Sequence, residues 1–288
     1  MAKKIVIISG KGGTGKTFIS AALCAIGKNK VIVDADVDAA DLFLLLNPIT
    51  KEIYKFSGGY KALIDENLCI KCGNCYNVCH FEAINKNFFI DDILCEGCGF
   101  CAKICPNNAI EMQPANSGEW YISETQYGSF VHAKLGIAEE NSGKLVSLIK
   151  YKATEIADKN KCEWIIIDGP PGIGCSVIAC LSGADIALVV TEPTLSGLED
   201  AKRVIEVAKH FSVQINLVIN KYDLNEKMTD LIEQYCLAQS IPIIGKIKFD
   251  SIVVSSIVNG KNIMELPDAN TGEIKQVMEK IWKSLIKK

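Results

Sequence analysis

Eight of the thirteen cysteines stand in two runs of identical spacing, and this repeat constrains the fold more than any other feature. The runs are Cys69, Cys72, Cys75, Cys79 and Cys95, Cys98, Cys101, Cys105, at an offset of 26 residues. A disulfide framework suits secreted proteins, and zinc prefers two separated cysteine pairs. Three thiolates at two-residue intervals instead favour one iron–sulfur cubane for each run, with a fourth ligand from further away.

The segment from Gly58 to Pro114 resembles the bacterial two-cluster ferredoxin module, in which the fourth cysteine of each run binds the other cluster. By this resemblance one [4Fe-4S] cluster takes Cys69, Cys72, Cys75 and Cys105, and the other takes Cys95, Cys98, Cys101 and Cys79. Pro106 follows the second run as the family pattern has it, whereas His80 replaces the proline after the first run. That departure leaves the implied ligands intact.

The same segment carries the acidic excess of the chain. It has four lysines and seven acidic residues, so its formal charge of -3 equals that of all 288 residues. An acidic face would steer the module toward a basic redox partner, and it would also keep a small module solvated. Both interpretations stay open. The rest of the chain has a formal net charge of zero. This gives no support for nucleic-acid binding, which requires a strongly basic face.

The chain opens with an apolar strand that runs into a phosphate-binding loop. Residues 4–9 predict a buried parallel strand, residues 10–17 match the P-loop pattern, and residues 18–26 predict a helix. The expected phosphate-binding residues are Gly12, Gly13, Thr14, Gly15, Lys16 and Thr17. Their backbone N–H groups would surround phosphate oxygens at the helix N-terminus. Lys16 would neutralise the β- and γ-phosphates, and the Thr17 hydroxyl would bind Mg²⁺.

Acidic residues follow two further predicted strands. Asp34 and Asp36 come after the strand 31–33, and Asp168 comes after the strand 164–167. The carboxyl ends of parallel strands meet at the sheet edge where the P-loop also lies. We therefore expect an α/β P-loop NTPase with a mostly parallel sheet flanked by helices. Asp168 would hold Mg²⁺, and Gly172 would belong to a mobile switch loop.

Outside the insert, the chain resembles the deviant-Walker ATPases of the MinD/ParA/Mrp group, which includes the nitrogenase iron protein. The resemblance rests on Lys11 in the loop, on the Asp34-Ala35-Asp36 sequence, and on 168–172, Asp-Gly-Pro-Pro-Gly. It implies a homodimer in which Lys11 reaches the partner's ATP, Asp36 orients the attacking water and Asp34 supports Mg²⁺. The single arginine, Arg203, falls in a predicted helix away from these motifs. A lysine must therefore supply the cation that phosphoryl transfer requires.

The choice of nucleotide depends on a motif near the end of the sheet. Residues 220–223, Asn-Lys-Tyr-Asp, follow the predicted strand 215–219 and have the spelling of a guanine-binding motif. The loop 10–17 and the switch sequence fit the ATPase group instead, in which the asparagine at this strand end contacts adenine. We expect ATP, with Asn220 as a base contact.

Over its full length the chain resembles MinD-superfamily P-loop ATPases that contain an inserted ferredoxin domain. We expect ATPase parts at 1–57 and 115–288 and a small α+β ferredoxin domain at 58–114, inserted between the second and third strands of the sheet. The implied function is a dimeric Mg-ATPase that couples ATP to electron transfer through both clusters toward a redox partner. A cluster or metallocofactor carrier acting on a client metalloprotein, and an ATP-dependent redox-sensing scaffold, remain alternatives.

Five cysteines lie outside the runs. Cys24, Cys162, Cys180 and Cys236 are interpreted as buried small hydrophobic residues. Cys175 falls at the predicted start of a helix after the switch loop. It would either pack locally or share a metal or cluster with its mate across a dimer axis.

Two features speak against membrane association. No stretch approaches the roughly 18 uninterrupted apolar residues of a spanning helix, and the N-terminus has no signal-peptide pattern. We therefore expect a cytoplasmic protein. Apolar residues at helical spacing in 273–288 predict a helix that packs on the sheet, rather than one that binds a membrane surface.

Overall fold

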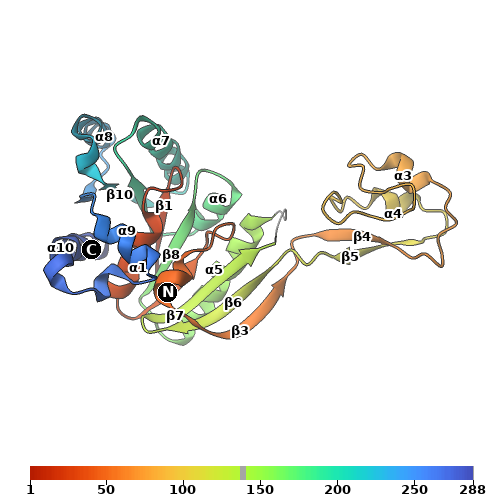
Figure 1. Cartoon of the computed structure of the whole chain (residues 1–288), viewed down its shortest axis with the longest axis horizontal. Coiled ribbons are helices and arrows are strands. Elements are labelled where there is room, and N and C mark those ends of the chain that lie inside the picture. The colour runs from red at the N-terminus through yellow and green to blue at the C-terminus, as the bar shows by residue number, and fades with distance from the viewer. Residues whose placement is uncertain (137–140, 288) are drawn as a thin grey trace. The chain divides into compact units, whose positions relative to one another are not determined.

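The computed structural model describes residues 1–136 and 141–287, and these form two compact units (Figure 1). The larger unit comprises Met1–Ile53, Trp120–Lys134 and Ser142–Lys288, and the smaller unit comprises Tyr54–Glu119 and Leu135–Asn141. The domain boundaries expected at 58 and 114 stay a prediction.

Among the described residues, the larger unit is built on a nine-stranded sheet in the order β11-β10-β9-β1-β8-β2-β7-β6-β3. Its strands are β1 (Lys3–Ser9), β2 (Lys30–Asp34), β3 (Ile49–Phe56), β6 (Gly118–Thr125), β7 (Gly128–Leu135), β8 (Trp164–Pro171), β9 (Ile186–Thr191), β10 (Gln214–Asn220) and β11 (Ile243–Ile247). β1 is parallel to β8 and β9, β2 is parallel to β8 and β7, and β10 is parallel to β9 and β11. The expected mostly parallel sheet is confirmed.

The strand count expected around the insert is wrong. Between β2 and β8 the chain adds three further strands to the sheet, β3, β6 and β7, and β7 pairs directly with β2. The smaller unit's main segment is therefore inserted after β3 and before β6. Seven of the eight residues of β3 are exposed. Its sequence also lacks the regular apolar alternation that marks a half-buried strand, which is why the sequence did not predict it.

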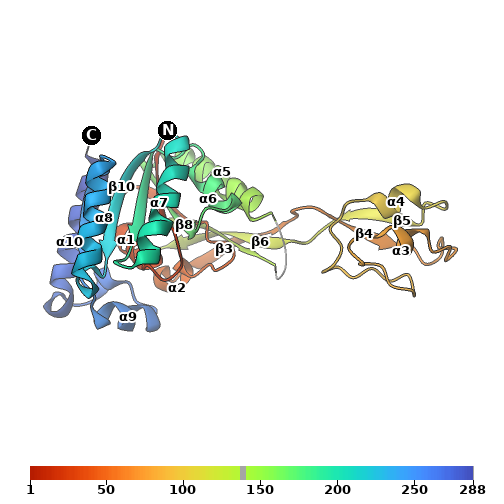
Figure 2. The same ribbon diagram turned by 90° about the horizontal axis from the view of Figure 1, so that it is seen from above.

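Helices flank this sheet. α1 (Lys16–Ile26) contacts the C-terminal α10 (Asp268–Ile286), and α7 (Leu195–His210) lies along β9. α5 (Ser142–Lys159) and α6 (Cys175–Leu181) lie side by side in Figure 2 and contact each other. The other described helices of this unit are α2 (Leu42–Leu46), α8 (Glu226–Ala238), α9 (Ser251–Val258) and the short η1 (Tyr222–Leu224) and η2 (Ile263–Glu265). None of the described helices has the length and apolar character needed to cross a membrane.

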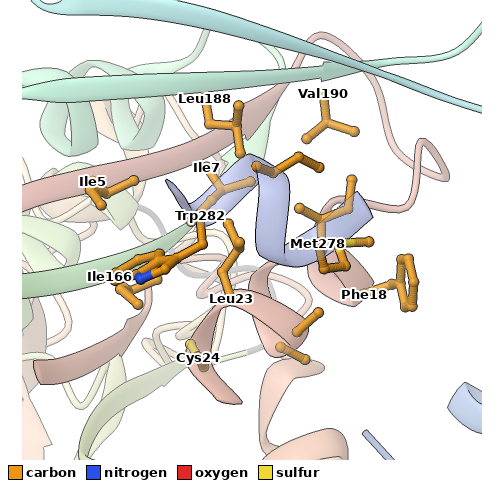
Figure 3. Close-up of a cluster of buried hydrophobic side chains, with 14 of the residues drawn as sticks. Ile5, Ile7, Phe18, Leu23, Cys24, Ile166, Leu188, Val190, Met278 and Trp282 are labelled. Atoms are coloured by element: carbon orange, nitrogen blue, oxygen red, sulfur yellow. The ribbon is translucent and has the colours of Figure 1, made fainter. Parts of the chain in front are cut away.

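The core that holds the nucleotide loop in place lies between β1, α1 and α10 (Figure 3). Ile5 and Ile7 of β1, Leu23 of α1, and Met278 and Trp282 of α10 are buried together there. Each such side chain stabilises the fold by roughly 1.5–3 kcal/mol. The expected packed helix at 273–288 is confirmed through residue 286, and residue 288 lies outside the described residues.

The smaller unit pairs β4 (Tyr60–Ile64) with β5 (Ile110–Pro114) in an antiparallel ribbon and has two described helices, α3 (Asn74–Val78) and α4 (Phe100–Ile104) (Figure 1). Its backbone repeats at the same 26-residue offset as its cysteines. Three matched pairs have positive φ angles: Lys71 and Gly97, Gly73 and Gly99, and Glu82 and Asn108. The amide of Asp65 donates to the carbonyl of Ala109, and in the matching position the amide of Asp91 donates to the carbonyl of Ala83. The sequence repeat is therefore also a structural repeat.

Candidate functional site

The loop between β1 and α1 has the geometry of an anion-binding site. Gly13 and Gly15 have φ angles of 79° and 89°, and no side chain caps the N-terminus of α1. A Cβ on Gly15 would lie 2.2 Å from Asn220 Nδ2, so this position requires glycine for space as well as for conformation. The N–H groups at the start of α1 are therefore directed to an external acceptor, and a phosphate is suited to them.

The structure brings Lys16 and all three predicted acids together beside this loop. Lys16 Nζ lies 2.9 Å from Asp168 Oδ1 and 3.5 Å from Asp36 Oδ2. Ser20 Oγ donates to the same Asp168 oxygen at 2.7 Å. Asp34, which is fully buried, accepts hydrogen bonds from the amides of Asp36 and Leu42. Asp34 thus also ties down the loop that follows β2.

The charges in this cluster do not balance. Burial raises the pKa of Asp36 to about 6, and burial together with Asp168 raises the pKa of Asp34 well above its usual range. Burial alone would lower the pKa of Lys16, but the three carboxylates outweigh it and raise that pKa. Within the described residues, Asp168 Oδ2 is buried without a hydrogen-bond partner. The orphaned oxygen suits Mg²⁺, which proteins hold through one or two carboxylates together with substrate phosphates.

Lys16→Met is expected to destabilise the nucleotide-free protein by about 3–5 kcal/mol at pH 8, because it leaves buried carboxylates uncompensated. Urea unfolding measures this, and the double variant Lys16→Met/Asp36→Asn should recover part of the loss. Lys202→Met, which breaks an exposed pair with Glu199, is the control and should change stability by less than about 1 kcal/mol. Equal stability of Lys16→Met and wild type would contradict the electrostatic role.

Lys11 extends from the same loop to the segment after β9. Its Nζ lies 2.8 Å from Glu192 Oε1 and donates to Ser196 Oγ at 2.9 Å and to Thr194 Oγ1 at 3.2 Å. Glu192 Oε2 also pairs with Lys221 Nζ at 3.0 Å. Burial alone would raise the pKa of Glu192, but hydrogen bonds from both lysines lower it. We call the Lys11–Glu192–Lys221 group the Lys11 clamp.

The end of β10 supports the loop from the other direction. Asn220 Nδ2 donates to Thr14 O at 2.8 Å, and Lys221 Nζ donates to Gly13 O at 3.1 Å. Asp223 accepts from the amide of Phe249 at 2.7 Å. The amide nitrogen of Asn220 is thus engaged with the phosphate loop, and its predicted contact with adenine stays a prediction.

Three residues of this site are absent from the sequence-based expectations: Ser20, Glu192 and Lys221. Ser20 lies one helical turn after Lys16 and therefore faces the same way. Glu192 follows β9 and Lys221 follows β10, at the sheet edge that also collects Asp34 and Asp168. The strand-end rule that found the aspartates would have found Glu192 and Lys221, had it been applied to every strand.

Two cavities in the smaller unit are each lined by four cysteines. The first is bordered by Cys69, Cys72, Cys75 and Cys105, and the second by Cys79, Cys95, Cys98 and Cys101. The crossed fourth cysteine matches the grouping that the ferredoxin resemblance implies. The amide of Ala109 donates to Cys105 Sγ at 3.3 Å, a kind of contact that tunes iron–sulfur potentials.

Within the described residues, no group of three or more His, Cys, Asp or Glu side chains is arranged to hold a single metal ion. A single ion draws its thiolates to about 2.3 Å from one point. A cubane instead keeps them around a body several ångströms wide. The four soft thiolates that line each cavity are donors of the kind that suits an iron–sulfur cluster.

The five remaining cysteines divide differently from the expectation. Cys24, Cys180 and Cys236 are buried as predicted. Cys162 is partly exposed, so the prediction of burial is wrong there; it lies just past the end of α5, in the turn that precedes β8. Cys175 is exposed and begins α6. Its role in packing or in a shared metal site stays a prediction.

Comparison with known proteins identifies a family to which this chain is similar. Residues 5–263 match the CobQ/CobB/MinD/ParA nucleotide binding domain. An uncharacterized protein of Methanocaldococcus jannaschii is 37% identical over 96% of each chain, and the septum site-determining protein MinD of Synechocystis is 27% identical over 92% of this chain and 82% of its own. The structure of Pyrococcus horikoshii MinD with Mg-ADP superposes with a TM-score of 0.58 at 20% identity, covering 100% and 97% of the two chains.

Proposed function

The chain belongs to the CobQ/CobB/MinD/ParA nucleotide-binding family as a MinD/ParA-like P-loop ATPase, and from this premise we propose that it couples Mg-ATP to electron transfer through two [4Fe-4S] clusters. The eight cysteines of the smaller unit would hold the clusters. One observation carries the proposal: each of two cavities is lined by the four cysteines that one crossed cluster requires. When bound, each cluster would accept and release one electron.

In the nucleotide site, Lys16 would exchange Asp36 and Asp168 for the β- and γ-phosphates. Thr17 and Asp168 would hold Mg²⁺, with support from Asp34, and Asp36 would orient the attacking water. The orphaned Asp168 oxygen supports these roles. The similar fold of the MinD structure that contains Mg-ADP supports the same nucleotide–metal pair here.

The base would be adenine. Asp223 is the carboxylate that would read guanine, and it already accepts the amide of Phe249. Asn220 lies beside the phosphate loop, where its Nδ2 donates to Thr14 O and its Oδ1 accepts from the amide of Lys221. The engaged carboxylate of Asp223 supports ATP over GTP.

The active form would be a homodimer in which Lys11 completes the partner's site. The Lys11 side chain is 27% exposed. Its ammonium group contacts Glu192, Thr194 and Ser196 rather than the aspartates proposed to support Mg²⁺. These polar partners would be exchanged for phosphate oxygens of the second subunit. The Lys11 clamp would therefore oppose dimer closure until ATP binds.

Glu192→Gln is expected to release Lys11 and to lower the ATP concentration at which half of the protein is dimeric by about fivefold, since a partly exposed ion pair contributes about 1 kcal/mol. Light scattering over an ATP titration measures this. Glu199→Gln, which removes an exposed pair with Lys202, is the matched control and should have no effect. An unchanged or higher midpoint for Glu192→Gln would refute the clamp.

Four thiolates around each cavity favour electron transfer over cluster delivery. They leave no open coordination position from which a client protein would capture the cluster. We propose a redox protein as the partner. The thirteen free cysteines of the described chain suit a reducing compartment such as the cytoplasm.

The test is anaerobic purification followed by iron and sulfide analysis, EPR spectroscopy and ATPase assay. We expect about eight irons per chain, ATP hydrolysis, and reoxidation of the reduced clusters that is faster with ATP than with ADP. Iron lost to an apo-protein during turnover would support the carrier alternative. ATP hydrolysis without iron would refute the redox proposal and leave the ATPase assignment intact.

A further inference from the structure

The internal repeat of the smaller unit allows its two cysteine-lined cavities to be compared position by position. Of the eight cysteines, Cys72 and Cys98 are exposed, and they occupy matched positions 26 residues apart. The other six are buried or partly exposed. If each cavity holds a cluster, as in the proposed function, these two thiolates are the ligands nearest to any docked protein.

The surroundings of the two exposed thiols differ, although the backbone is the same. We call the residues that line each cavity beside its exposed cysteine the mouth of that cavity. The Cys98 mouth consists of Cys98, Phe81, Glu96 and Phe100. The Cys72 mouth consists of Cys72, Asn107, Ile70, Lys71 and Asn74. Phe81 matches Asn107, Glu96 matches Ile70, and Phe100 matches Asn74 at the 26-residue offset.

Cluster binding does not explain this difference, because both cavities have equivalent cysteines and shared φ angles. At the Cys98 mouth, Phe81 and Phe100 are 41% and 52% exposed. Keeping two phenyl rings in water is unfavourable. The Cys72 mouth has amides in their places, its one exposed apolar side chain is Ile70 (61% exposed), and its charged residue is Lys71 rather than a carboxylate. Exposed aromatic rings are enriched at the centres of interfaces that a partner covers, and charged residues belong to the rim.

We propose that the Cys98 mouth is the docking surface for a redox protein whose contact face has an apolar centre and a basic rim. Glu96 and the module's net charge of -3 would steer that rim into place, and Phe81 and Phe100 would be desolvated on contact. One electron passes in each encounter, so one protein's centre is oxidised as the other's is reduced. No bond breaks and no proton moves.

The test exchanges matched residues between the mouths, because the matched positions share the same backbone repeat. Cytochrome c, a basic one-electron protein with an exposed haem edge, is the probe. We expect Phe81→Asn/Phe100→Asn to lower the second-order rate of its reduction by about tenfold in anaerobic stopped flow. Glu96→Ile should lower that rate about threefold at low salt and weaken its salt dependence. Asn74→Phe/Asn107→Phe is the matched control and should leave the rate unchanged.

Iron content, the EPR spectrum and oxidation by a small uncharged quinone should be the same in all variants. Equal rates for all variants, or slowing by changes at the Cys72 mouth alone, would overturn the docking proposal while leaving the clusters in place. Wild-type protein without iron would instead overturn the proposed function on which this inference rests. The two failures are therefore distinguishable.

Discussion

Lys11→Ala is expected to lower kcat for ATP hydrolysis by about a thousandfold or more, while Kd for ATP stays within about threefold of wild type. A cation that stabilises the transferring phosphoryl group in the transition state is worth roughly 10³–10⁵ in kcat. Lys11 contacts Glu192, Thr194 and Ser196 within its own chain, so its loss should leave the subunit's own binding loop intact. Single-turnover kinetics and nucleotide titration measure the two quantities separately.

Mixing two inactive variants shows whether this lysine acts on its own or on the partner's nucleotide. Lys11→Ala should still bind ATP. Lys16→Met should not bind ATP, but it still carries Lys11. In a mixed dimer the first subunit would hold ATP and the second would supply the lysine. We expect equimolar mixing to restore about a quarter of wild-type activity by random pairing, a signature of a shared site.

Arg203→Ala is the control for both experiments. It removes the chain's only arginine, which is 67% exposed on α7 and pairs with Asp200, and it should leave kcat unchanged. A large loss with Arg203→Ala would mean that the arginine supplies the catalytic cation. Mixed variants that stay inactive would mean that Lys11 acts within its own subunit.

The second large effect concerns the crossed cysteines. Cys105→Ser and Cys79→Ser should each remove about half of the iron, because each removes one ligand of one cluster. The pairing of cavities predicts that Cys105→Ser/Cys72→Ser loses no more than either single change, since both thiols line the first cavity. Cys105→Ser/Cys98→Ser should lose nearly all iron, since its two thiols line different cavities.

Iron and sulfide analysis after anaerobic purification, with EPR of the reduced protein, reads out this pattern. Cys236→Ser changes a buried cysteine outside both cavities and should keep the full iron content. The reverse pattern, in which Cys105→Ser/Cys98→Ser keeps half of the iron and Cys105→Ser/Cys72→Ser loses all of it, would show that each run binds its own cluster. Non-additivity within a shared site makes the two arrangements distinguishable.

The features that could be predicted from the sequence are those set by local spacing. The P-loop, the strand-end Asp34 and Asp168, and the start of α6 at Cys175 each depend on a few consecutive residues whose backbone preferences are strong. The cysteine runs belong to the same class, because their 26-residue offset recurs in the backbone. The C-terminal helix could be recognised from its apolar period alone.

The features that the sequence left undetermined depend on neighbours far away in the chain. β3 has little apolar alternation and is a strand because β6 pairs with it, so the sequence did not predict this strand before the insert. Cys162 looks apolar by type but lies in a turn, where packing leaves it partly exposed.

By itself, the sequence of this protein determined a phosphate loop with its acids and two matched sets of thiols, because short-range spacing dictates both. Only the tertiary structure decided that Glu192 holds Lys11 and that Cys72 and Cys98 are the exposed thiols. The physical reason is that ion pairs, cavities and exposure depend on which distant segments meet when the chain folds.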